Sequence, residues 1–239
     1  MQNFYFSAVV RRGALMFAFI GIALCALLAA LPCRADGLDS LARFLRETHS
    51  GTAQFTQVVT PPPKNGLNGQ PPRQRTQSGA FAFKRPGQFR FDYQAPFEQT
   101  IVADGDTLWL YDADLNQVTA RPQAQTLSST PAALIATATD LKVLQRDYAL
   151  TAESQSGDGL QWIKAVPKPR DDGSSGALQS VRVGLKTSAD GVPVLAALDI
   201  LDSLGQRSQM TFSAFQLNPA IPPARFHFIP PPGADVVKQ

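Results

Sequence analysis

The sequence predicts a mainly β (α+β) fold, built on one large antiparallel sheet or barrel of about ten or eleven strands. First, apolar and polar residues alternate over most of the chain, which is the period of a half-buried strand. Second, Asp-Gly pairs, which favour tight hairpin turns, stand at 104–105, 158–159 and 190–191. Third, setting aside residues 1–35 of the 239 leaves 204, a length that suits one domain.

The first element is an apolar leader. Arg11 and Arg12 precede an uncharged run over residues 15–31, and Cys33-Arg34-Ala35 places small residues at positions −3 and −1 of a cleavage site. We expect residues 1–35 to be a cleaved secretory signal peptide and residues 36–239 to be a single exported domain. The apolar run is also at the short end of what spans a membrane, so an anchor is the alternative.

The charge balance changes once the leader is removed. The leader holds three of the 22 basic residues and none of the 19 acidic ones, so 19 of each remain. The pI near 9.0 therefore belongs to the leader. A chain with no basic excess is not expected to bind nucleic acid by neutralising phosphates. Both cysteines also lie in the leader, which removes disulfides and thiolate sites from the domain.

The remaining elements follow from periodicity. Leu38, Leu41, Ala42 and Leu45 have helical spacing and predict a helix over 38–48. Alternation then predicts strands, of which the clearest are 53–59, 80–83, 89–93, 108–111, 147–152, 159–166, 178–186, 194–201 and 209–217. The alternation is interrupted once, by a short apolar helix over 131–136 and a second helical turn near 141–144. Residues 61–76 and 167–176 are polar, rich in turn formers and predicted to be flexible loops.

No catalytic, metal or cofactor site is apparent. His49 and His227 are the only histidines and are far apart in sequence, which does not fit the ligand spacing of a zinc site. Asp104-Gly105-Asp106 lacks the later ligands of a calcium loop and is better explained as a hairpin turn. The chain has no Gly-x-Ser-x-Gly elbow and no Walker loop. We expect no cofactor and no enzyme activity.

Aromatic residues gather in one short segment. Five phenylalanines and a tyrosine fall within 17 residues: Phe81, Phe83, Phe89, Phe91, Tyr93 and Phe97. Arg85 has the same strand parity as Phe81 and Phe83, so a strand that runs straight to Pro86 would point its guanidinium at the phenylalanine face. A strand that ends at Lys84 would instead leave Arg85 in a solvated turn. Parity alone leaves both readings open.

These residues resemble a known family. The segment 83–91, Phe-Lys-Arg-Pro-Gly-Gln-Phe-Arg-Phe, is similar to the Lys-Arg-Pro-x-x-Phe element of the LolA family of periplasmic outer-membrane lipoprotein carriers. The similarity continues, in the same order, through 101–111, 116–120 and 130–136, and it includes 53–57 and 225–231 near the two ends.

The resemblance implies an open, strongly curved antiparallel sheet, an incomplete β-barrel closed by short helices that act as a lid. It implies an apolar cavity for the acyl chains of lipoproteins, for which Phe81, Phe83, Phe89, Phe91, Leu134 and Ile135 are the candidate lining. The lid would be the segment containing Pro131, Leu134 and Ile135. The family's latch, an arginine bonded to carbonyls of the lid, would be Arg85.

The resemblance also implies partners and a compartment. Acylated lipoproteins would be loaded in the periplasm by an inner-membrane ABC lipoprotein-releasing transporter and delivered to the outer-membrane acceptor LolB by a monomeric carrier. Four alternatives stay open: a LolB-like acceptor, an envelope-stress sensor domain, a periplasmic hydrolase with an unrecognised carboxylate site, and a plain sheet domain with a solid core. The residues before Cys33 match a lipid-attachment box poorly, which argues against an anchored acceptor.

Overall fold

The structure is a computed structural model that describes residues 37–62, 73–126, 138–154, 157–169 and 177–239. The predicted signal peptide, the predicted lid over 131–136 and most of the two predicted loops lie outside these ranges.

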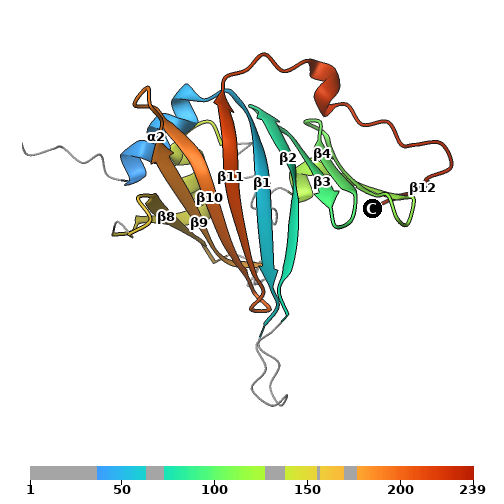
Figure 1. The fold of residues 1–239 in the computed structure, drawn as a ribbon, viewed down its shortest axis with the longest axis horizontal. Coiled ribbons are helices and arrows are strands. Elements are labelled where there is room, and N and C mark those ends of the chain that lie inside the picture. Colours follow the sequence, from blue (N-terminus) through green and yellow to red (C-terminus); the bar gives the residue numbers. More distant parts are fainter. Residues whose placement is uncertain (1–36, 63–72, 127–137, 155–156, 170–176) are drawn as a thin grey trace, which may run out of the picture. The chain divides into compact units, whose positions relative to one another are not determined.

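A single 12-stranded sheet dominates the fold, with the strand order β12-β6-β5-β4-β3-β2-β1-β11-β10-β9-β8-β7 (Figure 1). Neighbouring strands are antiparallel, except that β12 runs parallel to β6. The strands are β1 (Ser50–Thr60), β2 (Arg75–Lys84), β3 (Gln88–Ala95), β4 (Gln99–Ala103), β5 (Thr107–Asp112), β6 (Gln117–Pro122), β7 (Tyr148–Ala152), β8 (Gln161–Pro167), β9 (Leu178–Thr187), β10 (Pro193–Asp202), β11 (Arg207–Leu217) and β12 (Asp235–Lys238).

The predicted mainly β class and open, curved antiparallel sheet are confirmed, and the nine strand ranges predicted from alternation correspond to β1, β2, β3, β5, β7, β8, β9, β10 and β11. β12 raises the number of strands above the expected ten or eleven. It has only four residues and pairs with a strand far away in sequence, so local periodicity could not reveal it.

The predicted Asp-Gly turns lie between strands, and side chains stabilise them. Between β4 and β5, Asp104 Oδ1 accepts hydrogen bonds from the backbone N–H groups of Asp106 (2.9 Å) and Thr107 (2.8 Å). Asp104 Oδ2 accepts one from Trp109 Nε1 at 2.8 Å. Although partial burial opposes ionisation, these hydrogen bonds hold the pKa of Asp104 below its ordinary value. The segment 104–106 is therefore a hairpin turn, as its sequence indicated.

Helices cover one face of the sheet. α2 (Gly37–Glu47) buries Leu41, Phe44 and Leu45, and contacts β7, β8, β9 and β10. α5 (Leu141–Asp147) begins after Asp140, whose side chain accepts a hydrogen bond from the backbone N–H of Val143, and it buries Leu144 against the same region. α3 (Gln123–Thr126) follows β6, and the 3₁₀ helix η2 (Pro223–Phe226) lies in the C-terminal arm that follows β11. None of the helices in the described ranges is long and apolar enough to cross a membrane.

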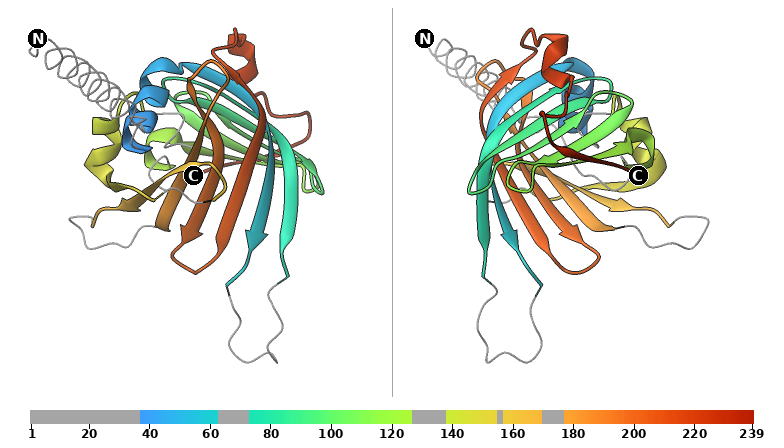
Figure 2. Two further views of the ribbon diagram at one scale, coloured as in Figure 1. Left: turned by 60° about the vertical axis from the view of Figure 1, so that its left-hand side comes forward. Right: turned by 90° about the vertical axis from the view of Figure 1, so that its right-hand side faces the viewer.

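The long central strands twist together into a curved sheet, and α2 lies on its inner side (Figure 2). The main hydrophobic core fills the space between the inner face of the sheet and the helices, and it draws residues from α2, α5 and most of the strands. Alternation along β1 and β2 places the large apolar side chains on this inner face and the smaller or polar ones outside. The inner face therefore carries the main apolar surface of the described residues.

Candidate functional site

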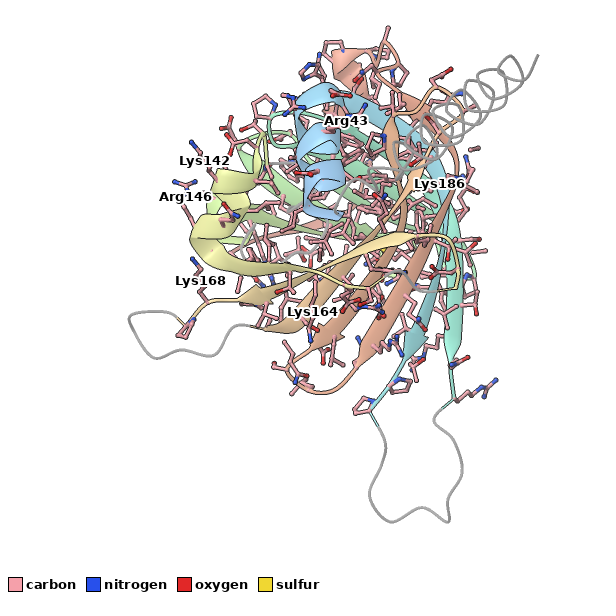
Figure 3. The ribbon with its side chains drawn as sticks, turned by 90° about the vertical axis from the view of Figure 1, so that its left-hand side faces the viewer. Arg43, Lys142, Arg146, Lys164, Lys168 and Lys186 are labelled. Carbon is pink, nitrogen blue, oxygen red and sulfur yellow. The ribbon has the colours of Figure 1, made fainter. Side chains whose placement is uncertain are left out.

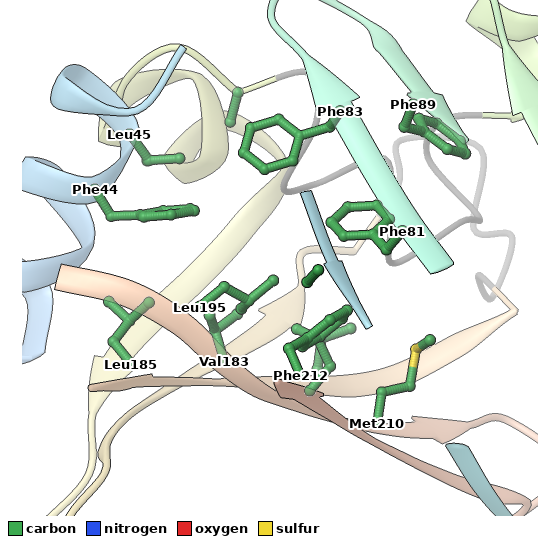
Figure 4. Close-up of a cluster of buried hydrophobic side chains, with 14 of the residues drawn as sticks. Phe44, Leu45, Phe81, Phe83, Phe89, Val183, Leu185, Leu195, Met210 and Phe212 are labelled. Atoms are coloured by element: carbon green, nitrogen blue, oxygen red, sulfur yellow. The ribbon is translucent and has the colours of Figure 1, made fainter. Parts of the chain in front are cut away.

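The four predicted lining phenylalanines lie together on the inner face of β2 and β3. Phe81 is directly opposite Phe91, and Phe83 is directly opposite Phe89. The ring centroids of Phe81 and Phe91 are 4.5 Å apart, and those of Phe81 and Phe83 are 5.7 Å apart. All four side chains are buried, and Figure 4 labels Phe81, Phe83 and Phe89 within the apolar cluster.

Other elements contribute aromatic rings that the sequence reasoning did not assign to the site. Phe55 of β1 packs edge-on against Phe91 at 5.4 Å, and Phe212 of β11 lies 5.5 Å from Phe81. Phe44 of α2 is 6.5 Å from Phe83 and covers it from the helical side. The alternation of apolar and polar residues in β1 and β11 could have predicted that Phe55 and Phe212 lie on the apolar face of their strands. Only the packing of α2 could place Phe44 here.

Arg85 combines features of both sequence readings. β2 ends at Lys84, as the turn reading requires, yet Arg85 is only 9% exposed, as the inward reading requires. Its backbone N–H donates to the His49 carbonyl at 2.8 Å, which extends the pairing with the neighbouring chain segment by one residue and keeps the parity of the strand.

The guanidinium of Arg85 lies over aromatic rings. Its central carbon is 5.0 Å from the ring centroids of both Phe44 and Phe83, which is cation–π distance. Burial lowers the pKa of Arg85 to about 10, so the group stays charged at neutral pH. The structure thus places a cation between α2 and the aromatic inner face of the sheet, with one ring from each in contact.

The space between helices α2 and α5 and strands β7, β8 and β9 is nearly closed. A cavity of about 20 Å³ remains there, and it is lined by Leu41, Phe44, Leu45, Leu144, Leu150, Ile163, Ala165 and Val183. Such a volume holds about one water molecule, and this lining is apolar throughout. An acyl chain would therefore have to move α2 or α5 away from the sheet to enter at this point.

The predicted lid residues Pro131, Leu134 and Ile135 lie outside the described residues. The described chain resumes at Ala138, which is fully buried and belongs to the same apolar cluster as the four phenylalanines. The segment that follows the predicted lid is therefore held at the inner face, and the lid assignment itself stays a prediction.

The outer face of the sheet carries a groove of about 690 Å³. It lies between β1, β2 and β11 and the C-terminal arm, and its lining includes Gln54, Ala80, Ala82, Ala214 and Ile221. The arm is held beside it by two hydrogen bonds to β3: Arg225 donates to Asp92 at 2.7 Å, and Arg90 donates to the Arg225 backbone carbonyl at 3.4 Å.

A further face carries basic side chains around α2, α5, β8 and β9 (Figure 3). They are Arg43, Lys142, Arg146, Lys164, Lys168 and Lys186. Acidic residues lie on the same elements, and Glu47 pairs with Arg43 at 3.3 Å. Asp140 and Asp147 flank α5 at its two ends. Among the described residues, basic and acidic side chains are thus mixed on this face.

In the described ranges, no group of three or more His, Asp or Glu side chains is arranged to hold a metal ion. His49 precedes β1 and His227 follows η2, and both are exposed.

Comparison with known proteins identifies the family. The sequence model described as "Outer membrane lipoprotein carrier protein LolA" matches residues 46–229. The outer-membrane lipoprotein carrier protein of Albidiferax ferrireducens is 57% identical over 205 residues, which cover 86% of this chain and 92% of that protein. The protein of the same name from Leptothrix cholodnii is 45% identical over 229 residues, covering 96% and 98% of the two chains. Among solved structures, a LolA superfamily protein from Nitrosomonas europaea aligns with a TM-score of 0.43 at 14% identity, covering 80% of this chain and 96% of that one. The matched range and the identities establish that this chain belongs to the LolA family of outer-membrane lipoprotein carrier proteins.

Proposed function

We propose that this protein is a periplasmic chaperone that binds the acyl chains of lipoproteins at the inner face of its sheet and carries them to the outer membrane. The observation that carries the proposal is the aromatic inner face itself: Phe81, Phe83, Phe89 and Phe91 form one buried surface that helices cover. The names of the relatives support the same cargo, since they are lipoprotein carriers.

The chemistry of the cargo explains why such a surface is needed. Exposing a chain of about 15 carbons to water costs about 12 kcal/mol, at about 0.8 kcal/mol per methylene. A water-soluble carrier must offer a comparable apolar surface, and that surface must itself be covered when no cargo is bound. The buried phenylalanines and the nearly closed cavity under α2 fit the covered state.

We further propose that Arg85 controls the change between covered and open states. Its guanidinium lies 5.0 Å from a ring of α2 and 5.0 Å from a ring of β2, so separating the helix from the sheet breaks at least one of these contacts. In this proposal the segment containing Pro131, Leu134 and Ile135 is the lid.

The route is proposed from the family: loading by an inner-membrane ABC transporter, and delivery to LolB by a monomeric, non-enzymatic carrier made of residues 36–239. No energy source for release is apparent in this chain, so we expect affinity for the acyl chain to be moderate.

The test is lipoprotein transfer with the Arg85→Leu variant. The wild-type protein should be recovered from the periplasm with lipoprotein bound, and mass spectrometry of the purified protein should detect its acyl chains. The variant should load cargo but deliver less of it to the acceptor. A wild-type protein with no acyl cargo would refute the carrier function, whereas unchanged loading and delivery by the variant would refute only the role of Arg85. Arg75→Leu, at an exposed position at the other end of β2, is the matched control.

A further inference from the structure

The inner face of β2 to β5 has an ordered composition that the family assignment does not explain. Directly paired residues form rows across these four strands. The first inward row is apolar and consists of Leu108, Ala103, Phe89 and Phe83. The second is also apolar and consists of Leu110, Ile101, Phe91 and Phe81. The third row is mostly polar and consists of Asp112, Gln99, Tyr93 and Gly79.

Strand pairing continues the third row onto β1 at Phe55, which is apolar, and the next inward position of β1, Gln57, is joined to Tyr93 by a hydrogen bond. The Tyr93 hydroxyl donates to Gln57 Oε1 at 2.9 Å, and Gln57 Nε2 in turn donates to the Ser208 hydroxyl. Gln57 has the same parity as the buried Ala53 and Phe55, so it lies on the inner face. We call Asp112, Gln99, Tyr93 and Gln57 the polar row.

Tyr93 marks the boundary between the two kinds of lining. Its ring packs on the aromatic rows, with centroid distances of 5.0 Å to Phe55 and 6.2 Å to Phe91. Gly79 lies between Phe55 and Tyr93 in the strand pairing. Burial raises the pKa of Tyr93 to about 12, so its hydroxyl remains a neutral donor in the hydrogen bond with Gln57.

An alkyl chain gains affinity on the aromatic rows but not on the polar row. Each methylene that leaves water for an apolar wall strengthens binding by about fourfold. Gln99 and Asp112 are only partly buried, and a chain lying over them would strip water from an amide and a carboxylate without replacing its hydrogen bonds. The gain per methylene should therefore fall to about nothing at this level.

We propose that the polar row sets the length of acyl chain that this protein binds best, because it ends the apolar lining two inward rows below Phe83 and Phe89. This inference rests on the proposed function and adds a specificity determinant to it. The row bounds the β1 to β5 half of the inner face. Met210 of β11, which is directly opposite Gln57, remains apolar, so a chain that instead follows β10 and β11 would not encounter the boundary.

The test uses a homologous series of saturated straight-chain fatty acids, titrated into the purified mature protein. The wild-type affinity should rise about fourfold per methylene and then reach a plateau. In the double variant Gln57→Leu/Tyr93→Phe, the plateau should move to longer chains, and the longest acid should bind at least about tenfold more tightly than to the wild type. Both residues are replaced together because a single change would leave the polar group of the other without this hydrogen bond.

Two further variants secure the interpretation. Gln54→Leu makes the same change on the same strand at an exposed outward position, and it should leave the plateau in place. Gln99→Leu changes the polar row at a partly exposed site, where folding is not at stake, and it should also move the plateau to longer chains.

The outcomes separate the two proposals. A wild-type affinity that keeps rising with chain length, or a plateau that neither the double variant nor Gln99→Leu moves, overturns the polar-row assignment and leaves the carrier function standing. A wild-type protein that binds no acid of any length refutes the carrier function, and the polar-row assignment fails with it.

Discussion

Asp199 holds two arginines on the outer face of the sheet, and its replacement by Asn should destabilise the fold. Asp199 of β10 is only 6% exposed. Its Oδ2 accepts from Arg182 of β9 at 3.1 Å, and its two oxygens accept from Arg207 of β11 at 2.8 and 2.6 Å. One carboxylate thus joins three adjacent strands, and Arg182 also pairs with Glu153.

The magnitude follows from these contacts. A hydrogen bond to a charged group contributes about 1.5–3 kcal/mol when it is buried. Arg207 is half-exposed, so its share must be reduced for solvent screening. An asparagine side chain has nearly the same shape as aspartate, but it would leave the guanidinium groups of Arg182 and Arg207 next to a neutral amide. We expect Asp199→Asn to lower the free energy of unfolding by about 2–3 kcal/mol at about pH 7.

The loss of unfolding free energy caused by Asp199→Asn should become smaller as the pH is lowered. Although burial opposes ionisation of Asp199, the hydrogen bonds and charges of Arg207 and Arg182 outweigh it and hold its pKa below the ordinary value. A carboxylate with a lowered folded pKa contributes stability that is fully present above its unfolded pKa of about 3.9 and is lost as the pH falls through the folded pKa. The difference between wild type and variant should therefore be full near neutrality and shrink below about pH 4.

Urea unfolding followed by circular dichroism at a series of pH values measures this difference. Asp190→Asn is the matched control, because Asp190 is exposed in a turn where Asn-Gly serves as well as Asp-Gly. A loss below about 0.5 kcal/mol near neutral pH, within the range of ordinary surface substitutions, would refute the reasoning. So would a deficit that stays constant as the pH is lowered.

Two further predictions concern packing at the inner face. Phe83→Ala should lower the free energy of unfolding by about 3–5 kcal/mol, because Phe83 is 0% exposed, whereas Phe97→Ala, at a side chain 62% exposed, should change it little. Equilibrium denaturation of both variants checks this, and equal losses would contradict it. Gly79→Ala should lower the free energy of unfolding by about 1–3 kcal/mol, because the added Cβ would lie 1.9 Å from the backbone carbonyl oxygen of Asp92. Gly157→Ala is the control, because a Cβ at Gly157 would meet no atom within 4 Å. A Gly79→Ala protein with wild-type melting behaviour would show that β3 can shift at no cost.

The sequence predicted much of the fold because the signals were local. Period-two alternation depends only on neighbouring residues, so β1, β3 and β11 could be found without knowing their partners. The Asp-Gly turns were predictable for the same reason. β12 was missed because its pairing with β6 joins residues more than a hundred positions apart.

The candidate site, too, was predictable from the sequence only where the signal was local. Strand parity predicted that Phe81 and Phe83 share one face of their strand and that Phe89 and Phe91 share one face of theirs. The register between β2 and β3 brought the two pairs together. Parity could not decide the environment of Arg85, because that depends on Phe44, which arrives from a separate helix. The polar row was equally invisible, since Asp112, Gln99 and Tyr93 become neighbours only when three strands pair in one register.

By itself, the sequence determined the β class, the turns and the aromatic composition of one strand face, because each follows from the spacing of residues along the chain. The tertiary structure alone decided which strands are neighbours, which helix covers the aromatic face and where the apolar lining ends. The physical reason is that strand register and helix packing join residues through space, and the alternation within any one strand carries no information about the strand beside it.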